Sequence, residues 1–239
     1  MNSIEYLKWD SKFFNKKIGK ISICDIDVVN NINGLFNIAK KEKYNLIYVF
    51  VKPKIKLPKE LFKNFNLALV DEKVTYKTTI NNKIINNNLS KVSNYNSSVL
   101  NSDLEQLAYE SGKYSRFKID SGFHKSEFFK LYKRWIKNSI NKINNKEVFV
   151  YSENQEIAGM VTLDYNDKAG NIGLIAVSQQ FQGRGIGTKL VEQCFLELSK
   201  KGIPNIEVVT QKNNLGANKL YQKNGFKTKN IVNIYHLWL

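Results

Sequence analysis

A glycine-rich segment in the second half of the chain has the residue types of an anion-binding loop. In Gln182–Gly187, glycine alternates with other residues, and an apolar pattern that predicts a helix follows from Thr188. Glycine lets the backbone approach an anion without a Cβ in the way, and the first N–H groups of a helix lie at the positive end of its dipole. We therefore expect this loop to bind phosphate groups.

Two common phosphate-binding loops do not account for this segment. A P-loop places Lys and then Ser or Thr directly after its last glycine, but the order here is Gly187-Thr188-Lys189. A dinucleotide-binding loop has the spacing G-x-G-x-x-G and an acidic residue at the end of the next strand. The chain has G-x-G-x-G, and its next expected strand ends in Val209-Thr210. Neither motif fits.

A second motif lies downstream, with the spacing N-x-x-A-x-x-x-Y-x-x-x-G-F. Its residues are Asn214, Ala217, Tyr221, Gly225 and Phe226. Together with the loop sequence Q-G-R-G-I-G, it resembles the GNAT superfamily of acetyltransferases, whose loop signature is Gln/Arg-x-x-Gly-x-Gly/Ala. The resemblance covers about residues 99–239. It implies an α/β (α+β) fold with a mixed, mostly antiparallel sheet flanked by helices, and acetyl-CoA as co-substrate.

The resemblance implies a role for each matching residue. Backbone N–H groups of residues 183–188 would hold the pyrophosphate of CoA, and the strand Leu174–Val177 would pair with its pantetheine arm. A bulge in that strand would aim an N–H at the thioester oxygen. The implied cofactor-binding residues are Leu174, Ile175, Ala176, Val177, Gln182, Gly183, Arg184, Gly185, Ile186, Gly187, Thr188, Asn214 and Ala217.

Tyr221 is the implied catalytic residue, which would protonate the departing thiolate, and Asn214 would hydrogen-bond the cofactor. Each has a structural alternative: Tyr221 as a half-buried aromatic residue of an amphipathic helix, and Asn214 as a helix N-cap. The general base stays open, because the cofactor strand has no carboxylate between Ile172 and Val177. The alternatives for the base are Asp164, Glu207, His236 and a chain of water molecules.

Two further segments, Trp9–Phe14 and Ser111–Phe117, resemble one GNAT branch, the TDP-fucosamine acetyltransferases and related enzymes that act on nucleotide-linked amino sugars. The strand Asn171–Val177 and the ending Tyr235–Leu239 are also similar. This implies such a sugar as the acceptor, with Arg116 clamping its phosphates. The aromatic residues implied to stack on its base or sugar ring are Trp9, Phe13, Phe14, Tyr114 and Phe117.

The acceptor-binding residues also have structural alternatives. The aromatic cluster has the composition of core packing. Arg116 is spaced to form a surface ion pair with Asp120. Both alternatives stand beside the sugar-binding interpretation.

The chain is strongly basic, with 37 Lys and Arg against 21 Asp and Glu and a formal net charge of +16. Such a charge attracts polyanions, including CoA and nucleotide sugars. We favour a compositional bias over a nucleic-acid partner, because lysines are scattered along the whole chain. Only three arginines occur, Arg116, Arg134 and Arg184, and Arg116 and Arg184 fall in the segments singled out above.

Several classes of protein are not expected. Cys24 and Cys194 lie far apart, and with His124 and His236 they have no metal-ligand spacing, so we expect neither a zinc site nor a disulfide framework. The N-terminus lacks the apolar segment of a signal peptide, and the longest apolar run, Leu46–Val51, is too short to span a membrane. We expect a cytoplasmic protein without a membrane partner, and a homodimer stays open.

The periodicity predicts two domains, an α/β domain at residues 1–88 that contributes to acceptor binding and a catalytic domain at residues 99–239, with a linker at 81–98 rich in Asn, Ser and Lys. The expected strands are Lys17–Cys24, Asn45–Val51, Val148–Tyr151, Glu156–Tyr165, Asn171–Ser178 and Ile206–Thr210. Ala68–Ile80 and Phe226–Leu239 are each expected as a strand or a hairpin. The expected helices are Asn33–Glu42, Ser102–Ser111 with Ser102 or Asp103 as N-cap, Lys125–Ile140, Thr188–Lys201 and Asn214–Asn224.

These observations predict an acetyl-CoA-dependent N-acetyltransferase that acts on the amine of a nucleotide-linked amino-deoxy sugar, with dTDP as the expected nucleotide and direct attack in a ternary complex. One alternative keeps the enzyme class and makes the acceptor a protein, a peptide, a polyamine or an antibiotic. Another is a CoA- or nucleic-acid-binding module without catalytic activity.

Overall fold

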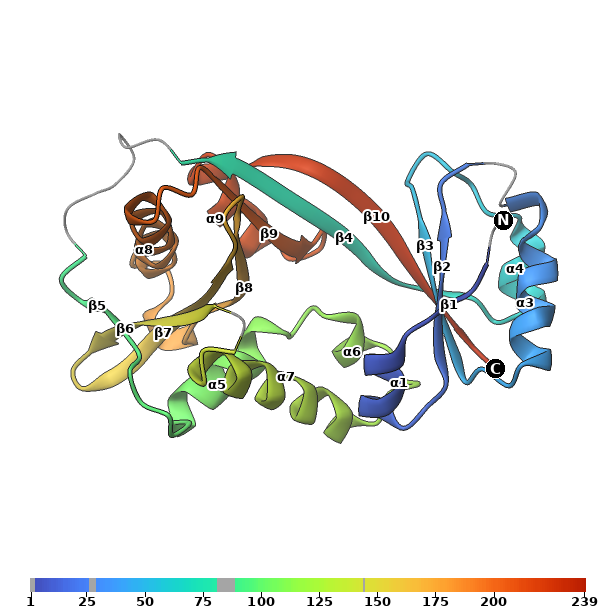
Figure 1. Ribbon diagram of the computed structural model, residues 1–239, viewed down its shortest axis with the longest axis horizontal. Coiled ribbons are helices and arrows are strands. Elements are labelled where there is room, and N and C mark those ends of the chain that lie inside the picture. Colours follow the sequence, from blue (N-terminus) through green and yellow to red (C-terminus); the bar gives the residue numbers. More distant parts are fainter. Residues whose placement is uncertain (1–2, 26–28, 81–88, 144) are drawn as a thin grey trace. The chain divides into compact units, whose positions relative to one another are not determined.

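The computed structural model describes residues 3–25, 29–80, 89–143 and 145–239. These residues form two compact units. The first comprises Met1–Val74, Ile119–Gly122 and Asn230–Leu239, and the second comprises Thr75–Lys118 and Phe123–Lys229. Two long strands, β4 (Ala68–Thr79) and β10 (Lys227–Trp238), contribute residues to both units (Figure 1). The expected domain bounds at residues 88 and 99 stay a prediction.

In the first unit the strands follow the order β1-β2-β3-β10-β4. The elements that precede β4 are β1 (Glu5–Tyr6), α1 (Lys8–Phe14), β2 (Ile18–Ile23), α3 (Ile32–Lys41), β3 (Leu46–Val51) and α4 (Lys59–Asn64). Strands β2 and β3 are parallel, whereas β10 runs antiparallel to β3. Helices α3 and α4 bring Phe36 and Leu61 into one buried cluster with Ile21 of β2 and Val49 of β3, which forms the core of this unit.

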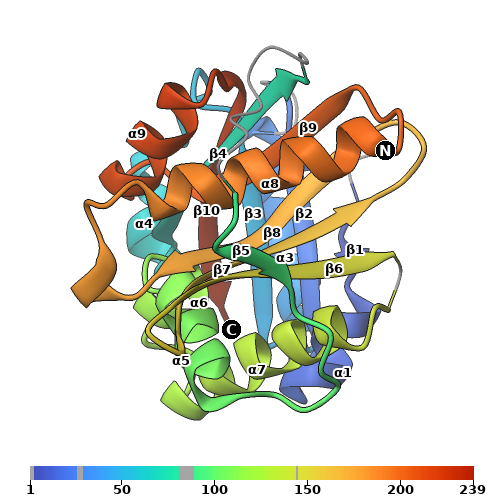
Figure 2. The same cartoon turned by 90° about the vertical axis from the view of Figure 1, so that its left-hand side faces the viewer.

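The second unit has the strand order β4-β9-β8-β7-β6-β5. Its further strands are β5 (Val92–Asn94), β6 (Lys146–Glu153), β7 (Glu156–Tyr165), β8 (Gly170–Val177) and β9 (Asn205–Gln211). Its helices are α5 (Ser102–Ser111), α6 (Arg116–Ile119), α7 (Lys125–Ile140), α8 (Ile186–Lys200) and α9 (Leu215–Lys223), with a short 3₁₀ turn at Gln179–Phe181. Helix α8 covers one face of the strands β6–β8, and α5 and α7 cover the opposite face (Figures 1 and 2).

Local sequence signals explain where several of these elements begin and end. Helix α7 starts with a capping box, in which the side chain of Glu127 accepts from the N–H of His124 and the ring of His124 accepts from Ser126 N. Gly202 and Gly225 directly follow the C-caps of α8 and α9 with φ of 68° and 80°, as expected for glycines that end helices.

Four details of the predicted elements were wrong or missing. The N-cap of α5 is Asn101, whose side chain accepts from Asp103 N, so neither Ser102 nor Asp103 has that position. Helix α8 begins at Ile186 rather than Thr188, because Gly185 adopts a left-handed N-cap conformation. Strand β5 lies inside the expected linker, where it pairs with β6; residues 81–88 of that linker lie outside the described residues. The short helices α1, α4 and α6 were not predicted.

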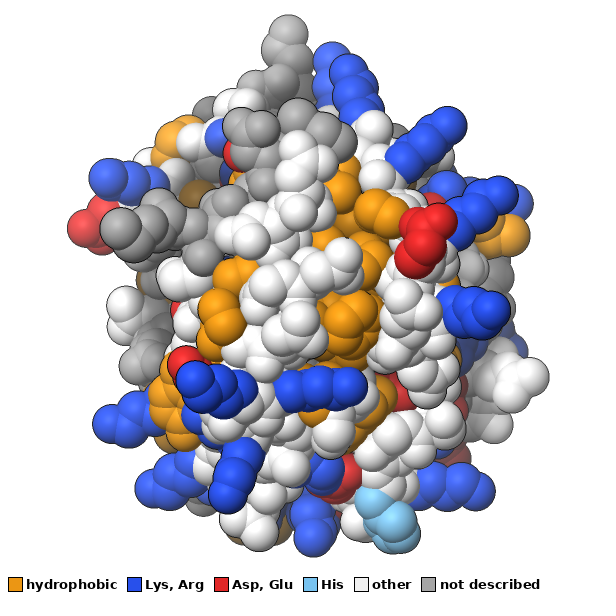
Figure 3. All heavy atoms as spheres, turned by 90° about the vertical axis from the view of Figure 1, so that its right-hand side faces the viewer, with side chains coloured by type: hydrophobic (Ala, Val, Ile, Leu, Met, Phe, Trp, Pro, Cys, Tyr) orange, Lys and Arg blue, Asp and Glu red, His pale blue; other side chains and the backbone are white. Residues whose placement is uncertain are grey.

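The lysine-rich composition is visible on the surface. On the face shown in Figure 3, Lys and Arg side chains lie along the rim and also across the lower part of the face. This view agrees with the scattering of lysines along the whole sequence.

Candidate active site

The glycine-rich loop adopts the conformation that an anion-binding loop requires. Gly183 and Gly185 have φ of 79° and 76°, in the left-handed region that residues with a Cβ rarely adopt. A Cβ added at either glycine would meet no atom within 4 Å, so the backbone angle and not crowding makes glycine necessary here. The loop leads directly into α8, whose first residue is Ile186.

The backbone N–H groups of this loop are available to a ligand. The first residues of an α-helix have no intrahelical acceptor for their N–H groups. Within the described part of the chain, the structure records no hydrogen bond donated by the N–H groups of residues 183–188, and Lys189 N is the first to bond back, to Gly185 O at 3.2 Å. A row of free donors at the positive end of a helix dipole suits the pyrophosphate of CoA.

Strands β8 and β9 separate next to this loop. Their parallel pairing includes Gly170, Asn171 and Ile172 of β8, and the recorded register goes no further, although β8 continues to Val177. On its other edge, β8 stays paired with β7 as far as Val177 opposite Gly159. The part of β8 after Ile172 therefore has one edge without a recorded partner, where an extended ligand can pair with the backbone.

An irregularity in the pairing of β8 with β7 accompanies this separation, because Gly173 and Leu174 of β8 both stand opposite Thr162 of β7. The β7–β8 register shifts between Val161 and Leu163, and Thr162 Oγ1 accepts from Leu174 N at 2.8 Å. The sequence resemblance implied a bulge in the cofactor strand, and the shift lies at that level of the sheet. Because successive N–H groups of a strand point to opposite edges, the N–H of Ile175 is expected at the free edge.

The loop and the free edge of β8 border one cavity of about 440 Å³. Most of the implied cofactor-binding residues line it. These are Ile175, Ala176, Val177, Gln182, Gly183, Gly185, Ile186, Gly187, Thr188, Asn214 and Ala217. The structure thus brings together the two sequence motifs and the strand that precedes them.

Two of the implied cofactor-binding residues do not line the cavity. Leu174 is buried and turns its N–H to Thr162. The guanidinium of Arg184 donates to Gln180 O at 3.2 Å, lies over the ring of Phe181 and pairs with Glu153 at 3.7 Å. Arg184 therefore stabilises the approach to the loop, and its backbone N–H remains part of the donor row.

Helix α9 supplies a further wall. The side chain of Asn214 accepts from Ala217 N at 3.2 Å, so Asn214 is the N-cap of the helix and also lines the cavity. Leu220 lines the cavity as well, whereas Tyr221 is not among the lining residues and is only 2% exposed. Burial raises the pKa of the Tyr221 hydroxyl well above its usual value, so this group stays protonated.

The end of α5 and the turn after it form the opposite wall, with Glu110, Ser111, Lys113 and Tyr114. Gly112 allows this arrangement, because a Cβ there would lie 2.2 Å from the ring of Tyr132. Tyr114 was an implied substrate-binding residue, whereas Glu110 and Lys113 were not predicted. Lys113 lies within the segment that resembles the amino-sugar branch, so that resemblance could have pointed to it. Glu110 lies just before the segment, and nothing in the sequence pointed to it.

Glu110 is the only carboxylate that lines the cavity, and within the described residues it makes no ion pair. The carboxylates considered from the sequence are engaged elsewhere. Asp164 accepts from Asn171 at 3.2 Å, and Glu207 pairs with Lys229 at 2.7 Å. Neither Asp164 nor Glu207 lines the cavity.

The remaining implied residues of the second unit lie in packed surroundings. Phe117 is 8% exposed and packs edge-on against Phe123 and Trp135. The guanidinium of Arg116 lies 4.4 Å from the centre of the Phe117 ring. Neither Arg116 nor Phe117 lines the cavity.

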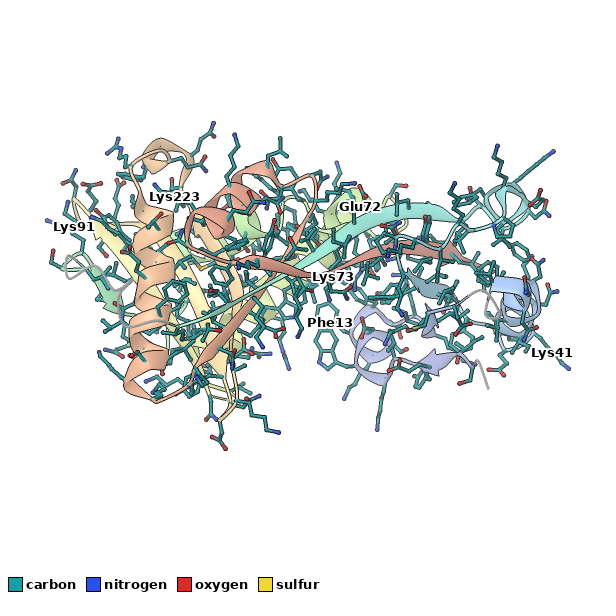
Figure 4. All side chains as sticks on the ribbon, turned by 90° about the horizontal axis from the view of Figure 1, so that it is seen from above. Phe13, Lys41, Glu72, Lys73, Lys91 and Lys223 are labelled. Atoms are coloured by element: carbon teal, nitrogen blue, oxygen red, sulfur yellow. The ribbon has the colours of Figure 1, made fainter. Side chains whose placement is uncertain are left out.

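The first unit contains the implied aromatic residues of α1. Trp9 and the residue one turn later, Phe13, are stacked with ring centres 5.1 Å apart and planes within 6°, and Trp9 is 49% exposed. Phe14 is 5% exposed and meets Phe13 edge to face. Only Trp9 and Phe13, the latter labelled in Figure 4, thus form an accessible stacked pair.

His236, a third alternative for the base, is fully buried in the first unit. Its Nδ1 lies 2.5 Å from Asp120 Oδ2, which also accepts from Trp238 Nε1 at 3.0 Å, and its ring stacks on Tyr48. Burial raises the pKa of Asp120, but the hydrogen bonds from His236, from the N–H of Gly122 and from Trp238 outweigh it, so the net pKa is lowered.

Two negative findings concern the residues that the structure describes. Among them, no group of three His, Cys, Asp or Glu side chains is arranged to hold a metal ion. Nor does the described chain contain a helix whose length and apolar character would let it cross a membrane.

Comparison with known proteins agrees with this geometry. Residues 110–226 match the model of the acetyltransferase (GNAT) family. This stretch contains the cavity wall from Glu110 onward, the glycine-rich loop and the motif on α9. The match therefore supports the sequence resemblance to this family for the part of the second unit that contains the cavity.

Two curated relatives match part of the chain. An uncharacterized N-acetyltransferase of Methanocaldococcus jannaschii is 31% identical over 124 residues, which are 48% of this chain and 55% of the relative. The spore coat polysaccharide biosynthesis protein SpsD of Bacillus subtilis is 24% identical over 133 residues, 56% of this chain and 46% of the relative. The chain thus spans about half the length of the curated relatives that it matches.

Solved structures show the same fold over nearly the whole chain. A functionally unknown conserved protein from Staphylococcus epidermidis has a TM-score of 0.68 at 12% identity and covers 100% of this chain and 92% of its own. A GCN5-related N-acetyltransferase from Sphaerobacter thermophilus has a TM-score of 0.60 at 12% identity, with 98% and 75% covered. The predicted GNAT fold with its mixed sheet and flanking helices is confirmed.

Proposed function

We propose that this protein is an acetyl-CoA-dependent N-acetyltransferase that acts on the amine of a nucleotide-linked amino-deoxy sugar, with dTDP as the expected nucleotide. The observation that carries the acetyl-CoA part is the row of free N–H donors at residues 183–188 beside the unpaired edge of β8, in one cavity. Phosphates suit the donors, and an extended amide-containing arm suits the strand edge.

The residues of the cavity, and Tyr221, which is buried in α9 next to the lining residue Leu220, have complementary tasks in this proposal. Acetyl-CoA supplies the acetyl group, already activated as a thioester. The N–H of Ile175 stabilises the oxyanion that develops when the amine attacks, and the protonated hydroxyl of Tyr221 donates to the departing sulfur. Glu110, the carboxylate of the cavity wall, accepts a proton from the amine.

The acceptor is proposed from three observations. The stacked pair of Trp9 and Phe13 offers an exposed aromatic face to a base or sugar ring. Lys113 and Tyr114 add a positive charge and an aromatic ring to the cavity wall, with the ammonium 5.3 Å from the ring centre. The third observation is the partial similarity to a spore coat polysaccharide biosynthesis protein, which supports a role in polysaccharide biosynthesis.

One observation favours a different acceptor. A second cavity of about 440 Å³ shares Glu110 and Phe181 with the first. Its wall carries the carboxylates of Asp103, Glu110 and Glu156 and no Lys or Arg. In so basic a protein, an acidic cavity next to the proposed site suits a cationic amine such as a lysine side chain or a polyamine.

The test is a release assay with acetyl-CoA and a panel of acceptors, in which free CoA thiol is followed. The panel contains dTDP- and UDP-linked amino sugars, a lysine peptide and spermidine. Because Cys24 is exposed, a blank with protein alone is subtracted. Rapid release with one nucleotide sugar alone supports the proposal. Release with only peptide or spermidine replaces the sugar by a cationic acceptor, and acetyl-CoA binding without any release contradicts the proposed activity.

A further inference from the structure

A tyrosine from the first half of the sequence lies against α9 in the second unit. Strand β4 carries Glu72 and Lys73, labelled in Figure 4, in the first unit and Tyr76 in the second. The side chain of Tyr76 is 3% exposed, and its ring centre lies 5.8 Å from that of Tyr221. The proposed proton donor is thus packed against a residue that belongs to neither sequence motif.

The hydroxyl of Tyr76 makes two hydrogen bonds to α9. It donates to Asn218 Oδ1 at 2.9 Å and accepts from Gln222 Nε2 at 3.3 Å. A tyrosine hydroxyl can both donate and accept, so these two bonds use both capacities. Tyr76 is therefore joined to residues on either side of Tyr221 along the helix.

Asn218 passes this contact on to the turn before α9. Its Nδ2 donates to the carbonyl groups of Gln211, Lys212 and Asn214, at 3.0, 3.1 and 2.7 Å. Only the amide nitrogen can donate to carbonyl groups, so the bond from Tyr76 to Oδ1 fixes which end of the Asn218 amide faces the turn. The turn ends at Asn214, whose side chain caps the helix and lines the cavity.

We propose that Tyr76 is a positioning residue of the active site, which acts through Asn218 to hold Asn214 and through ring packing to hold Tyr221. The inference rests on the proposed function for what the two positioned residues do. Removing the hydroxyl leaves the aromatic ring in place but leaves Asn218 Oδ1 without its donor, so β4 no longer holds the amide that bonds the turn before α9. Small displacements of catalytic groups reduce turnover strongly.

The test compares Tyr76→Phe with Tyr165→Phe, a matched control. Tyr165 loses the same atom in the same unit, but its hydroxyl binds Glu147 at 3.0 Å and does not line the cavity. We expect Tyr76→Phe to lower kcat about 10-fold with little change in the acceptor KM. In an Asn218→Ala background the same change is expected to lower kcat less than twofold, because the amide through which the hydroxyl acts is absent. Equal effects in both backgrounds would argue against an action through Asn218.

Amide hydrogen exchange tests the positioning without relying on activity. In Tyr76→Phe the N–H of Ala217, which donates to Asn214, is expected to exchange at least several-fold faster than in the wild type, whereas Tyr165→Phe leaves it unchanged. Unchanged exchange in Tyr76→Phe contradicts the inference, whatever the activity. Faster exchange in a protein that transfers no acetyl group to any acceptor keeps the positioning contact and rejects the proposed function.

Discussion

The cavity of the second unit and the aromatic pair of the first unit present different groups to a ligand. The cavity presents main-chain N–H groups at residues 183–188, which glycines make accessible. Helix α1 instead presents the side-chain rings of Trp9 and Phe13. In the proposed function, main-chain donors would bind phosphate groups, which every CoA derivative carries, whereas exposed side chains can change with the acceptor. Cofactor and acceptor specificity should therefore respond to different substitutions.

The largest effect is expected at the proposed proton donor. Tyr221→Phe should lower kcat about 1,000-fold, in the range of general acid catalysis, with little change in acetyl-CoA affinity. Because burial raises the pKa of Tyr221, the hydroxyl stays protonated and its titration should cause no loss of kcat between about pH 7 and 9. Steady-state kinetics and calorimetry check both points, and unchanged turnover would remove Tyr221 from the mechanism.

A smaller effect is expected at Glu110. Glu110→Gln should lower kcat/KM for a strongly basic amine about 100-fold, because the ammonium form must lose a proton before attack. The loss should shrink with acceptors whose amines have a lower pKa, since these arrive neutral. Glu207→Gln, outside the cavity, is the control. A loss that is the same for all amines would show that Glu110 is not the base.

The main-chain side of the comparison is tested by Gly185→Ala. The φ of 76° costs about 1–2 kcal/mol for a residue with a Cβ, so the loop should relax and weaken acetyl-CoA binding about 10-fold. Gly202→Ala is the matched control, because its φ of 68° imposes a similar strain at the other end of α8. Both variants should unfold more easily, but only Gly185→Ala should bind acetyl-CoA less tightly in calorimetry.

The side-chain part of the comparison is tested by Trp9→Ala. Loss of one stacking partner should raise the KM of a nucleotide sugar about fivefold, the lower end of stacking energies, and leave acetyl-CoA affinity unchanged. Phe62→Ala on α4 removes another exposed aromatic ring of the first unit and serves as the control. An equal rise of the KM in both variants would show that Trp9 has no specific role in acceptor binding.

The smallest effect concerns stability in the first unit. The pKa of Asp120 is lowered on folding, so its ionised form contributes stability above the unfolded pKa of about 4 and loses it as pH falls through the folded value. Asp120→Asn should lower the free energy of unfolding at pH 7 by about 1–2 kcal/mol and flatten its decline in acid. Denaturant unfolding of the variant and the wild type at pH 7 and pH 3 measures both free energies of unfolding. An equal fall between the two pH values in both proteins would contradict the prediction.

The part of the site that the sequence predicted depends on local conformation. Gly183 and Gly185 are needed for their φ, and Asn214 caps the helix that begins with the next residue, so each signal lies within a few residues of its effect. The wall at Glu110 has no such signal, because a carboxylate at the end of a helix is common. Tyr76 lies 142 residues before its partner Asn218, and only the tertiary fold brings the two together.

The fold, like the site, was predicted only where local sequence signals determine the structure. Long periodic elements such as α7 and β7 were found, whereas α1 was missed because Leu7 offers it no side-chain cap and it has only 7 residues. Its position depends on Ser11, which bonds to Ile18 of the neighbouring strand. Similarly, β5 has a loop-like composition and becomes a strand through its pairing with β6. The membership of Ile119–Gly122 in the first unit also depends on distant contacts, here with His236 and Trp238.

The separation of β8 from β9 has a consequence for the protein before any ligand arrives. Unpaired strand edges invite other chains to add a strand, which is a route to aggregation. Here the open stretch is confined to the few residues after Ile172, and pairing with β7 holds the opposite edge. So short an opening accommodates the arm of a small molecule better than a foreign strand, and its length therefore limits self-association while preserving a place for the ligand.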